Sequence, residues 1–227
     1  MNNFIKIKNL NKKYEKNKTI RVLNDISFNF ESGKVYSIMG PSGSGKSTLL
    51  NLISLIDTPS SGILKMNNLK IDYNNQSNND DIRSKNIGII YQDKNLLSDF
   101  TALENVYLAR ITSGIDKKKA LDQSINILKK VGLSNRLNHF TSDLSGGESQ
   151  RVAISRALIN TPKIILADEP TGSLDHQTSK DIFRLLFRQK NKDRIIIYAT
   201  HNRYFANMAD CKISLVDGKI KSGNARF

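Results

Sequence analysis

The chain has 227 residues, 38% of them hydrophobic and 25% charged, which suits one α/β domain that buries a sizeable core. No apolar run approaches the roughly 20 residues that cross a bilayer, the N-terminus lacks the apolar core of a signal peptide, and the single cysteine, Cys211, excludes an internal disulfide and a cysteine-ligated zinc cluster, so we expect a cytoplasmic protein. The formal charge of +14 fits contact with anionic lipid, contact with nucleic acid or a solvated lysine-rich surface, and because no nucleic-acid-binding module accompanies it we expect no nucleic-acid partner.

Strands are predicted at residues 3–10 and 20–30, the latter as one strand or two, and the apolar run from Val35 to Met39 predicts a short buried strand. A glycine-rich loop follows, composed of Gly40, Pro41, Ser42, Gly43, Ser44, Gly45, Lys46, Ser47 and Thr48. A helix is predicted from Thr48 to Ile53, so the loop joins a strand to a helix. This order is typical of a phosphate-binding loop.

The chemistry of this loop suits a nucleotide. Its glycines let successive N–H groups point inward, and the N-terminus of the following helix adds partial positive charge. We expect Lys46 to reach the β- and γ-phosphates and the Ser47 hydroxyl to ligate Mg²⁺. Tyr14, upstream of the loop, could stack on adenine. The alternative is an ordinary half-exposed tyrosine at a strand edge.

The next segment predicts a turn at residues 57–62 and a strand at residues 63–66. Residues 72–81 are polar and rich in asparagine, with no apolar period, and predict a loop. Residues 86–91 predict a buried strand that ends at Gln92.

From about residue 95 to 160 the apolar period becomes that of helices, which predicts an inserted helical subdomain closed by a helix from about Gly147 to Asn160. Buried strands are predicted again at residues 163–167, 194–199 and 211–216, with a helix at residues 178–188. Strands that alternate with helices indicate an α/β fold whose largely parallel sheet is covered on both faces.

Two further polar clusters lie among these predicted elements. Asp168 and Glu169 end a buried strand, where α/β sheets place ligand chemistry. Asp168 suits the Mg²⁺ site and Glu169 could activate the water that attacks a γ-phosphate; the alternative is an ordinary acidic turn. The run Leu144, Ser145, Gly146, Gly147 and Glu148 opens a helix and forms a second anion-binding geometry.

Together these motifs resemble those of the ATP-binding subunits of ABC transporters. In this chain, Tyr14 matches the family's adenine-stacking residue, residues 40–48 match Walker A, and Gln92 matches the Q-loop glutamine. Residues 144–148 match the signature, residues 164–169 Walker B and residues 173–175 the D-loop, and His201 matches the switch histidine. The resemblance implies a P-loop NTPase core with an antiparallel β subdomain and an inserted α-helical subdomain. It implies a single domain over residues 1–227, with the core at 1–92 and 161–227 and the helical part at about 93–160.

The resemblance also implies the site. It assigns catalytic roles to Glu169, His201, Gln92 and Lys46, and it implies that Ser47, Gln92 and Asp168 hold Mg²⁺. ATP is held by Tyr14, by residues 40–48, and, across a head-to-tail homodimer, by Ser145, Gly146, Gly147 and Glu148 of the other copy. The expected partners are integral membrane permease subunits, so the chain would associate peripherally with the cytoplasmic side of the inner membrane.

Within the family, residues 95–106, 132–139 and 168–175 are similar to the lipoprotein-releasing LolD group, which implies a LolC/LolE-like membrane pair. The MacB-type efflux ATPases and the division protein FtsE share much of these stretches, and remain alternatives, as do ABC ATPases that act without membrane partners. Two positions depart from the common pattern: Ser149, where arginine is common, and Asn202, where aspartate is frequent.

Overall fold

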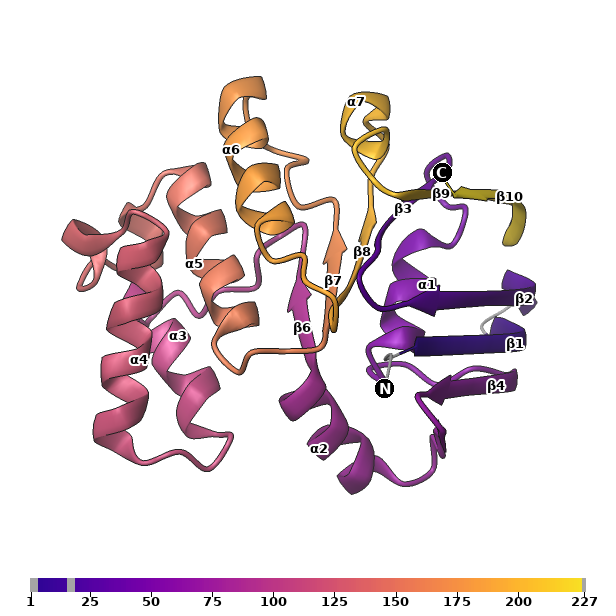
Figure 1. Cartoon of the computed structure of the whole chain (residues 1–227), viewed down its shortest axis with the longest axis horizontal. Coiled ribbons are helices and arrows are strands. Elements are labelled where there is room, and N and C mark those ends of the chain that lie inside the picture. Colours follow the sequence, from indigo (N-terminus) through magenta and orange to yellow (C-terminus); the bar gives the residue numbers. More distant parts are fainter. Residues whose placement is uncertain (1–3, 16–18, 226–227) are drawn as a thin grey trace.

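A computed structural model describes residues 4–15 and 19–225. Residue 3, at the start of the first predicted strand, lies outside the described residues. The fold contains a six-stranded sheet in the order β10-β9-β3-β8-β7-β6 and a four-stranded sheet in the order β2-β1-β4-β5. Figure 1 shows helices on both sides of the six-stranded sheet, and the four-stranded sheet at one end of the molecule.

The six-stranded sheet forms the core. Its members are β3 (Val35–Met39), β6 (Ile87–Ile90), β7 (Ile164–Asp168), β8 (Ile195–Ala199), β9 (Cys211–Val216) and β10 (Lys219–Ala225). The first five pair in parallel and β10 pairs antiparallel with β9. Every residue of β8 is buried. Such continuous apolar runs are typical of a parallel sheet that is covered on both faces.

The two faces of this sheet pack against different helices. Ile164, Leu166 and Ile197 share a cluster with α1 (Lys46–Ile53) and the four-stranded sheet. Ile165 and Ile196, whose side chains alternate with these, share a second cluster with α5 (Gly146–Leu158) and α6 (His176–Phe187). The two-residue period of each strand therefore assigns its side chains to the two sides.

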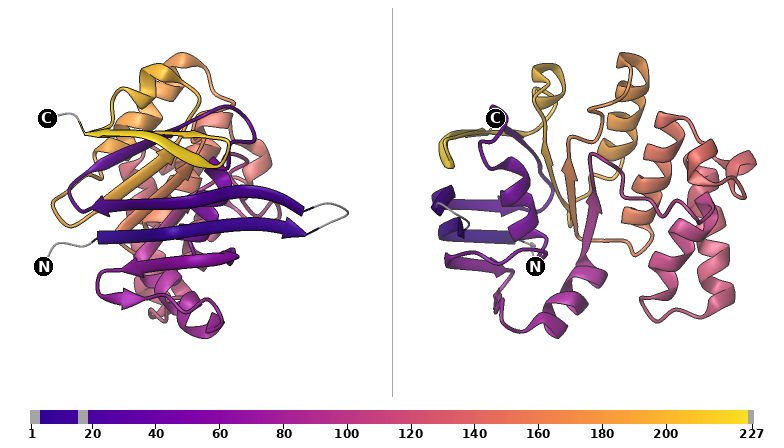
Figure 2. Two further views of the ribbon diagram at one scale, coloured as in Figure 1. Left: turned by 90° about the vertical axis from the view of Figure 1, so that its right-hand side faces the viewer. Right: turned by 180° about the vertical axis from the view of Figure 1, so that it is seen from behind.

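The second sheet is antiparallel and comprises β1 (Phe4–Glu15), β2 (Thr19–Glu31), β4 (Ser61–Met66) and β5 (Leu69–Lys70). Along β1, the buried side chains of Ile5 and Ile7 alternate with the exposed side chains of Lys6 and Lys8, so one face contacts the core and the other is solvated. The left view of Figure 2 shows this solvated side toward the viewer. The antiparallel β subdomain that the family resemblance implied is present.

The helical subdomain lies beyond α5, at the left of Figure 1. It comprises α3 (Ala102–Ile111), α4 (Lys117–Lys130) and two 3₁₀ turns, Ser134–Arg136 and Thr141–Asp143. Helices α3, α4 and α5 share a separate apolar cluster that includes Val106, Leu128 and Val152. A last short helix, α7 (Arg203–Ala206), follows β8.

One prediction was wrong. Most of the segment at residues 72–81, predicted as a loop, belongs to helix α2 (Gln76–Asn86). Asn75 caps its N-terminus by accepting a hydrogen bond from the N–H of Asn78. Ion pairs from Asp80 to Arg83 and from Asp81 to Lys85 join successive turns. A cap and charge pairs thus support a helix that lacks an apolar stripe.

None of the helices in the described part of the chain is long and apolar enough to cross a membrane.

Candidate active site

Most of the predicted catalytic and Mg²⁺-binding residues lie together in one hollow of about 480 Å³. We call it the P-loop hollow, after the phosphate-binding loop at residues 40–48. It is lined by Ser42, Gly43, Gly45, Lys46, Ser47, Thr48, Gln92, Asp168, Glu169 and His201, together with Val22. Gln92, Glu169 and His201 follow β6, β7 and β8, and the loop at residues 40–48 (the P-loop) follows β3. Because these strands are parallel neighbours, their carboxyl ends share one edge of the sheet. Val22, on β2, was not predicted to be part of the site.

Glycine is required at Gly45 of the P-loop. Its φ of 100° is disfavoured for other residues, and a Cβ there would lie 2.7 Å from Leu23 Cδ2 and 2.9 Å from the Val22 carbonyl oxygen. A Cβ on Gly40 would collide with the Leu215 carbonyl oxygen. The tight curl of this loop directs N–H groups inward at the start of α1.

The P-loop also offers cation and hydroxyl donors. Lys46 Nζ donates to the carbonyl oxygens of Gly40, at 2.9 Å, and Pro41, at 3.0 Å, so the ammonium lies over the loop. The Ser44 hydroxyl is buried and has no hydrogen-bond partner among the described residues. A cradle of N–H groups with a lysine fits a bound polyphosphate. Ser47, Gln92 and Asp168 offer hydroxyl, amide and carboxylate oxygens, the ligands that Mg²⁺ prefers.

Glu169 and His201 form a pair in the P-loop hollow. Glu169 Oε1 lies 3.0 Å from His201 Nδ1, with a side-chain exposure of 12% for the glutamate and 72% for the histidine. The Glu169 backbone has a φ of 43°, and its N–H donates to the Ala199 carbonyl at 3.1 Å. A non-glycine residue in this left-handed region is strained, and such strain is common at active sites.

Ser145, Gly146, Gly147 and Glu148 line a different hollow. This signature hollow is also lined by Leu174 and Asp175, which precede α6, and by Thr178 in the first turn of α6. None of its residues lines the P-loop hollow of the same chain. The structure therefore does not bring the signature and the P-loop into one hollow of a single chain.

The signature residues build the N-terminus of α5. Ser145 Oγ accepts from the Glu148 N–H at 3.2 Å, and Glu148 Oε2 accepts from the Ser145 N–H at 2.8 Å, which is a capping box. Arg136 Nε donates to the other Glu148 oxygen at 2.8 Å. The backbone hydrogen bond, then Arg136, holds the pKa of Glu148 below its usual value. Both Glu148 oxygens are thus engaged, whereas the Gly146 and Gly147 N–H groups open the helix without intrahelical partners.

Ser149, Asn202 and Tyr14 are each engaged locally. The Ser149 hydroxyl donates to the Ser145 carbonyl, and the Asn202 side chain caps α7 by accepting from the Tyr204 N–H. Tyr14 does not line the P-loop hollow. Its hydroxyl donates to Asp57 Oδ2 at 2.6 Å, and Lys12 Nζ lies 4.6 Å from its ring centroid. Burial, and then the Asp57 carboxylate, raise the pKa of Tyr14.

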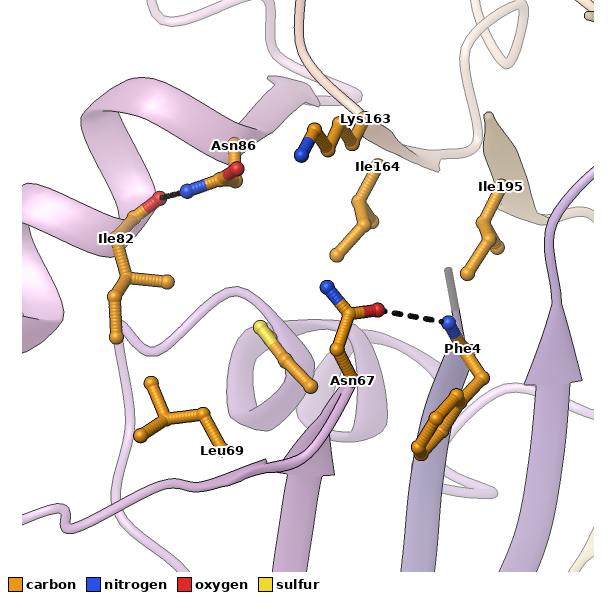
Figure 3. Close-up of a pocket in the computed structure, with 9 residues that line it drawn as sticks. Phe4, Asn67, Leu69, Ile82, Asn86, Lys163, Ile164 and Ile195 are labelled. Carbon is orange, nitrogen blue, oxygen red and sulfur yellow. Dashed lines mark hydrogen bonds between the residues drawn. The ribbon is translucent and has the colours of Figure 1, made fainter. Parts of the chain in front are cut away.

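Another hollow, shown in Figure 3, lies at the opposite end of β7 and β8, where Ile164 and Ile195 begin those strands. It has a volume of about 190 Å³ and is mainly apolar, with Lys163 as its one charged lining residue. It contains none of the predicted site residues, so the P-loop hollow is the candidate active site.

Comparisons with known proteins agree with this geometry. The ABC transporter family matches residues 23–172. The lipoprotein-releasing system ATP-binding protein LolD of Rickettsia felis is 44% identical over 223 residues, which cover 97% of this chain and 99% of that protein. The LolD of Bacteroides thetaiotaomicron is 39% identical over 204 residues, which cover 89% and 94%.

Solved structures give the same result. The dimeric post-hydrolysis state of the ATP-binding cassette MJ0796, bound to ADP and Pi, superposes with a TM-score of 0.90 and 36% identity over 97% of this chain and 98% of that one. The structure of cbiO1 from Clostridium perfringens, part of the transporter complex cbiONQ, gives a TM-score of 0.85 and 30% identity over 97% and 88%. The chain belongs to the ABC transporter family, as an ATPase subunit of the LolD type.

Proposed function

We propose that the chain hydrolyses Mg-ATP at the interface of a head-to-tail homodimer and thereby drives membrane permease subunits that release lipoproteins from the inner membrane. The observation that supports a dimer is the separation of the P-loop hollow from the signature hollow. The residues suited to hold a γ-phosphate are divided between the P-loop hollow and the signature hollow, which share no residue. A second copy that places its signature over the P-loop would complete the site.

The P-loop would bind the nucleotide. Lys46 would exchange the Gly40 and Pro41 carbonyls for the β- and γ-phosphates, whose full charge is the stronger acceptor. Tyr14 lies upstream on β1, and we propose that its ring contacts adenine beside the hollow. Mg²⁺, when bound by Ser47, Gln92 and Asp168, would neutralise phosphate charge.

Glu169 would act on the attacking water. Its carboxylate lines the hollow and contacts His201 Nδ1, so the two side chains can accept and hold the proton of that water. The exposed His201 ring is free to turn toward the γ-phosphate. Glu169 therefore supplies the base, and His201 orients the water or the phosphate.

The signature would bind the γ-phosphate of the other copy. The Ser145 hydroxyl oxygen accepts from Glu148, which leaves its O–H free to donate, and the Gly146 and Gly147 N–H groups lie at the positive end of α5. Glu148 would contribute through the cap, since both of its oxygens are engaged. Hydrolysis would remove the shared phosphate and weaken the dimer.

The names of the relatives support lipoproteins as the transported substrate. The membrane partners would be a LolC/LolE-like pair, and the chain would lie peripherally on the cytoplasmic side of the inner membrane. An FtsE-like role in division or a MacB-type role in efflux is the alternative.

The substitution Glu169→Gln tests the dimer. It removes the base and keeps the shape of the side chain, so Mg-ATP should remain bound and hold two copies together. Light scattering coupled to gel filtration should show a dimer with Mg-ATP and a monomer with ADP. A monomer under both conditions would contradict the proposal.

The transport role needs a separate experiment. A tagged chain, purified in mild detergent from its native membranes, should bring with it a LolC/LolE-like pair, and depletion should leave lipoproteins in the inner membrane. An FtsX-like partner would favour the division role and overturn lipoprotein release.

A further inference from the structure

The backbone that follows Gln92 is strained. Lys94 has a φ of 60° and Asn95 a φ of 47°, so two successive residues other than glycine occupy the left-handed region. Within the turn, the Lys94 N–H donates to the Tyr91 carbonyl at 3.2 Å and the Asn95 N–H to the Asp93 carbonyl at 2.6 Å. Such a conformation persists only where the surrounding structure holds it.

One side chain from a distant part of the sequence holds this turn. Arg156 Nη2 donates to the Lys94 carbonyl at 2.7 Å, and Arg156 Nη1 donates to the Asn95 carbonyl at 2.6 Å. The two nitrogens of one planar guanidinium thus contact two successive carbonyl groups. This geometry needs the fork of arginine, because a lysine ammonium offers no such pair of fixed donors.

The Arg156 guanidinium donates its hydrogen bonds to these two carbonyl groups. No carboxylate forms an ion pair with it within residues 4–15 and 19–225. Asp80 and Arg156 line one shallow hollow, but the Asp80 carboxylate pairs with Arg83. Burial lowers the pKa of the Arg156 guanidinium, which nevertheless remains charged at neutral pH. A partly desolvated cation that donates charge-assisted hydrogen bonds to two carbonyl oxygens is strongly bound to them.

Arg156 belongs to α5, the helix that begins with the signature residues. It lies ten residues after Gly146, a distance of about 15 Å along the helix axis. The turn lies two residues after Gln92, whose side chain lines the P-loop hollow. One rigid helix therefore connects the signature hollow to the backbone that carries Gln92.

We propose that Arg156 is a positioning residue: by holding the carbonyl groups of Lys94 and Asn95, it fixes the turn so that the Gln92 amide oxygen reaches the Mg²⁺ and the attacking water. This inference rests on the role proposed above for Gln92. Arg156 itself does not contact the P-loop hollow. Its loss should therefore weaken the use of Mg²⁺ and hydrolysis, and leave the phosphate cradle of the P-loop intact.

The test measures ATPase activity of the full-length chain, with ATP and Mg²⁺ varied independently. Arg156→Lys should raise the Mg²⁺ concentration for half-maximal activity and lower kcat, each by about 10-fold to 100-fold, as expected for loss of a group that orients a ligand. The KM for ATP should change far less. If this variant does not fold, Arg156→Gln, which retains one amide donor, replaces it.

Arg194 is the matched control. Its Nε donates to the Pro162 carbonyl at 2.8 Å and its Nη1 to the Gln189 carbonyl at 2.9 Å, and burial lowers its pKa as well. It precedes the first residue of β8, at the end of the sheet away from the P-loop hollow. Arg194→Lys should lower the melting temperature and leave the Mg²⁺ dependence unchanged. The same result for Arg156→Lys would show a purely structural role and overturn the proposal.

A double-mutant cycle with Gln92→Ala separates the positioning role of Arg156 from the role proposed for Gln92. If Arg156 acts through Gln92, Arg156→Lys should add little to the loss that Gln92→Ala causes alone. Fully additive losses would overturn the positioning role and leave the proposed function intact. A Gln92→Ala chain with the Mg²⁺ dependence of the unmodified protein would instead overturn the proposed role of Gln92, and with it this inference.

Discussion

At the scale of single residues, Glu169 combines a proposed chemical role with an unfavourable backbone. Its φ of 43° costs about 1–2 kcal/mol for a residue with a side chain. The hydrogen bond from its N–H to Ala199 ties this conformation to the end of β8, beside His201. The strain therefore accompanies the position that brings the carboxylate against the histidine.

Glu169→Asn should separate stability from activity. Asparagine tolerates the left-handed region better than glutamate, so the melting temperature should equal or exceed that of the unmodified chain. Phosphate release should fall about 10²-fold to 10⁴-fold, because the base is lost. Scanning calorimetry and a phosphate-release assay would measure both quantities.

Glu169→Gln is the control for this comparison. It loses the base equally but keeps a side chain that is unsuited to a positive φ, so it should melt below Glu169→Asn. A lower melting temperature for the asparagine variant would show that the backbone at this position stores little strain.

At the scale of elements, helices α3 and α5 begin in the same way. Ser145 and Glu148 form the capping box of α5, and Thr101 and Glu104 form an equivalent box on α3. In both boxes a backbone hydrogen bond is the main cause of the lowered pKa of the glutamate. The two caps are therefore similar in structure, and only that of α5 lines the signature hollow.

This pair allows the cap to be distinguished from the proposed phosphate contact. Ser145→Ala and Thr101→Ala should each cost about 1 kcal/mol, a fall in melting temperature of roughly 2–4 °C for a chain of this size. Only Ser145→Ala should also weaken the dimer that Mg-ATP forms in the Glu169→Gln background. Light scattering would detect the difference. Equal dimerisation by the two variants would exclude Ser145 from the interface.

At the scale of the whole molecule, the two hollows lie on different parts of one chain, so a head-to-tail dimer would contain two composite sites. Each site would use the P-loop of one copy and the signature of the other. Defects in the two motifs should then complement each other when they are carried by different copies.

Mixing Lys46→Ala chains with Ser145→Ala chains tests this arrangement. A dimer made of either variant alone has a defect in both of its composite sites. Random pairing makes half of the dimers mixed, and each mixed dimer has one intact site, so ATPase activity should recover to about a quarter of the unmodified level. The mixture would be no more active than its components if each copy completed its own site.

Some features of this protein could be predicted from the sequence because they depend on neighbouring residues. The glycines of the P-loop, the buried strands such as β8 and the change to helical period after residue 95 are local patterns of backbone freedom and apolar spacing. The carboxyl ends of parallel strands share one edge, so the convergence of Gln92, Asp168 and Glu169 followed once the sheet was predicted.

Other features were decided only by the tertiary structure, because they depend on contacts between distant residues. Helix α2 has no apolar period; besides its local cap and ion pairs, it depends on polar contacts with other elements, such as those of Arg83 with the Leu55 carbonyl and of Asn160 with the Ser84 carbonyl. The contact of Arg156 with the turn at Lys94 spans 62 residues. The left-handed backbone of Glu169 also follows from how the elements pack. Local sequence sets which residues can form a strand, a loop or a cap, whereas long-range packing decides which of these meet.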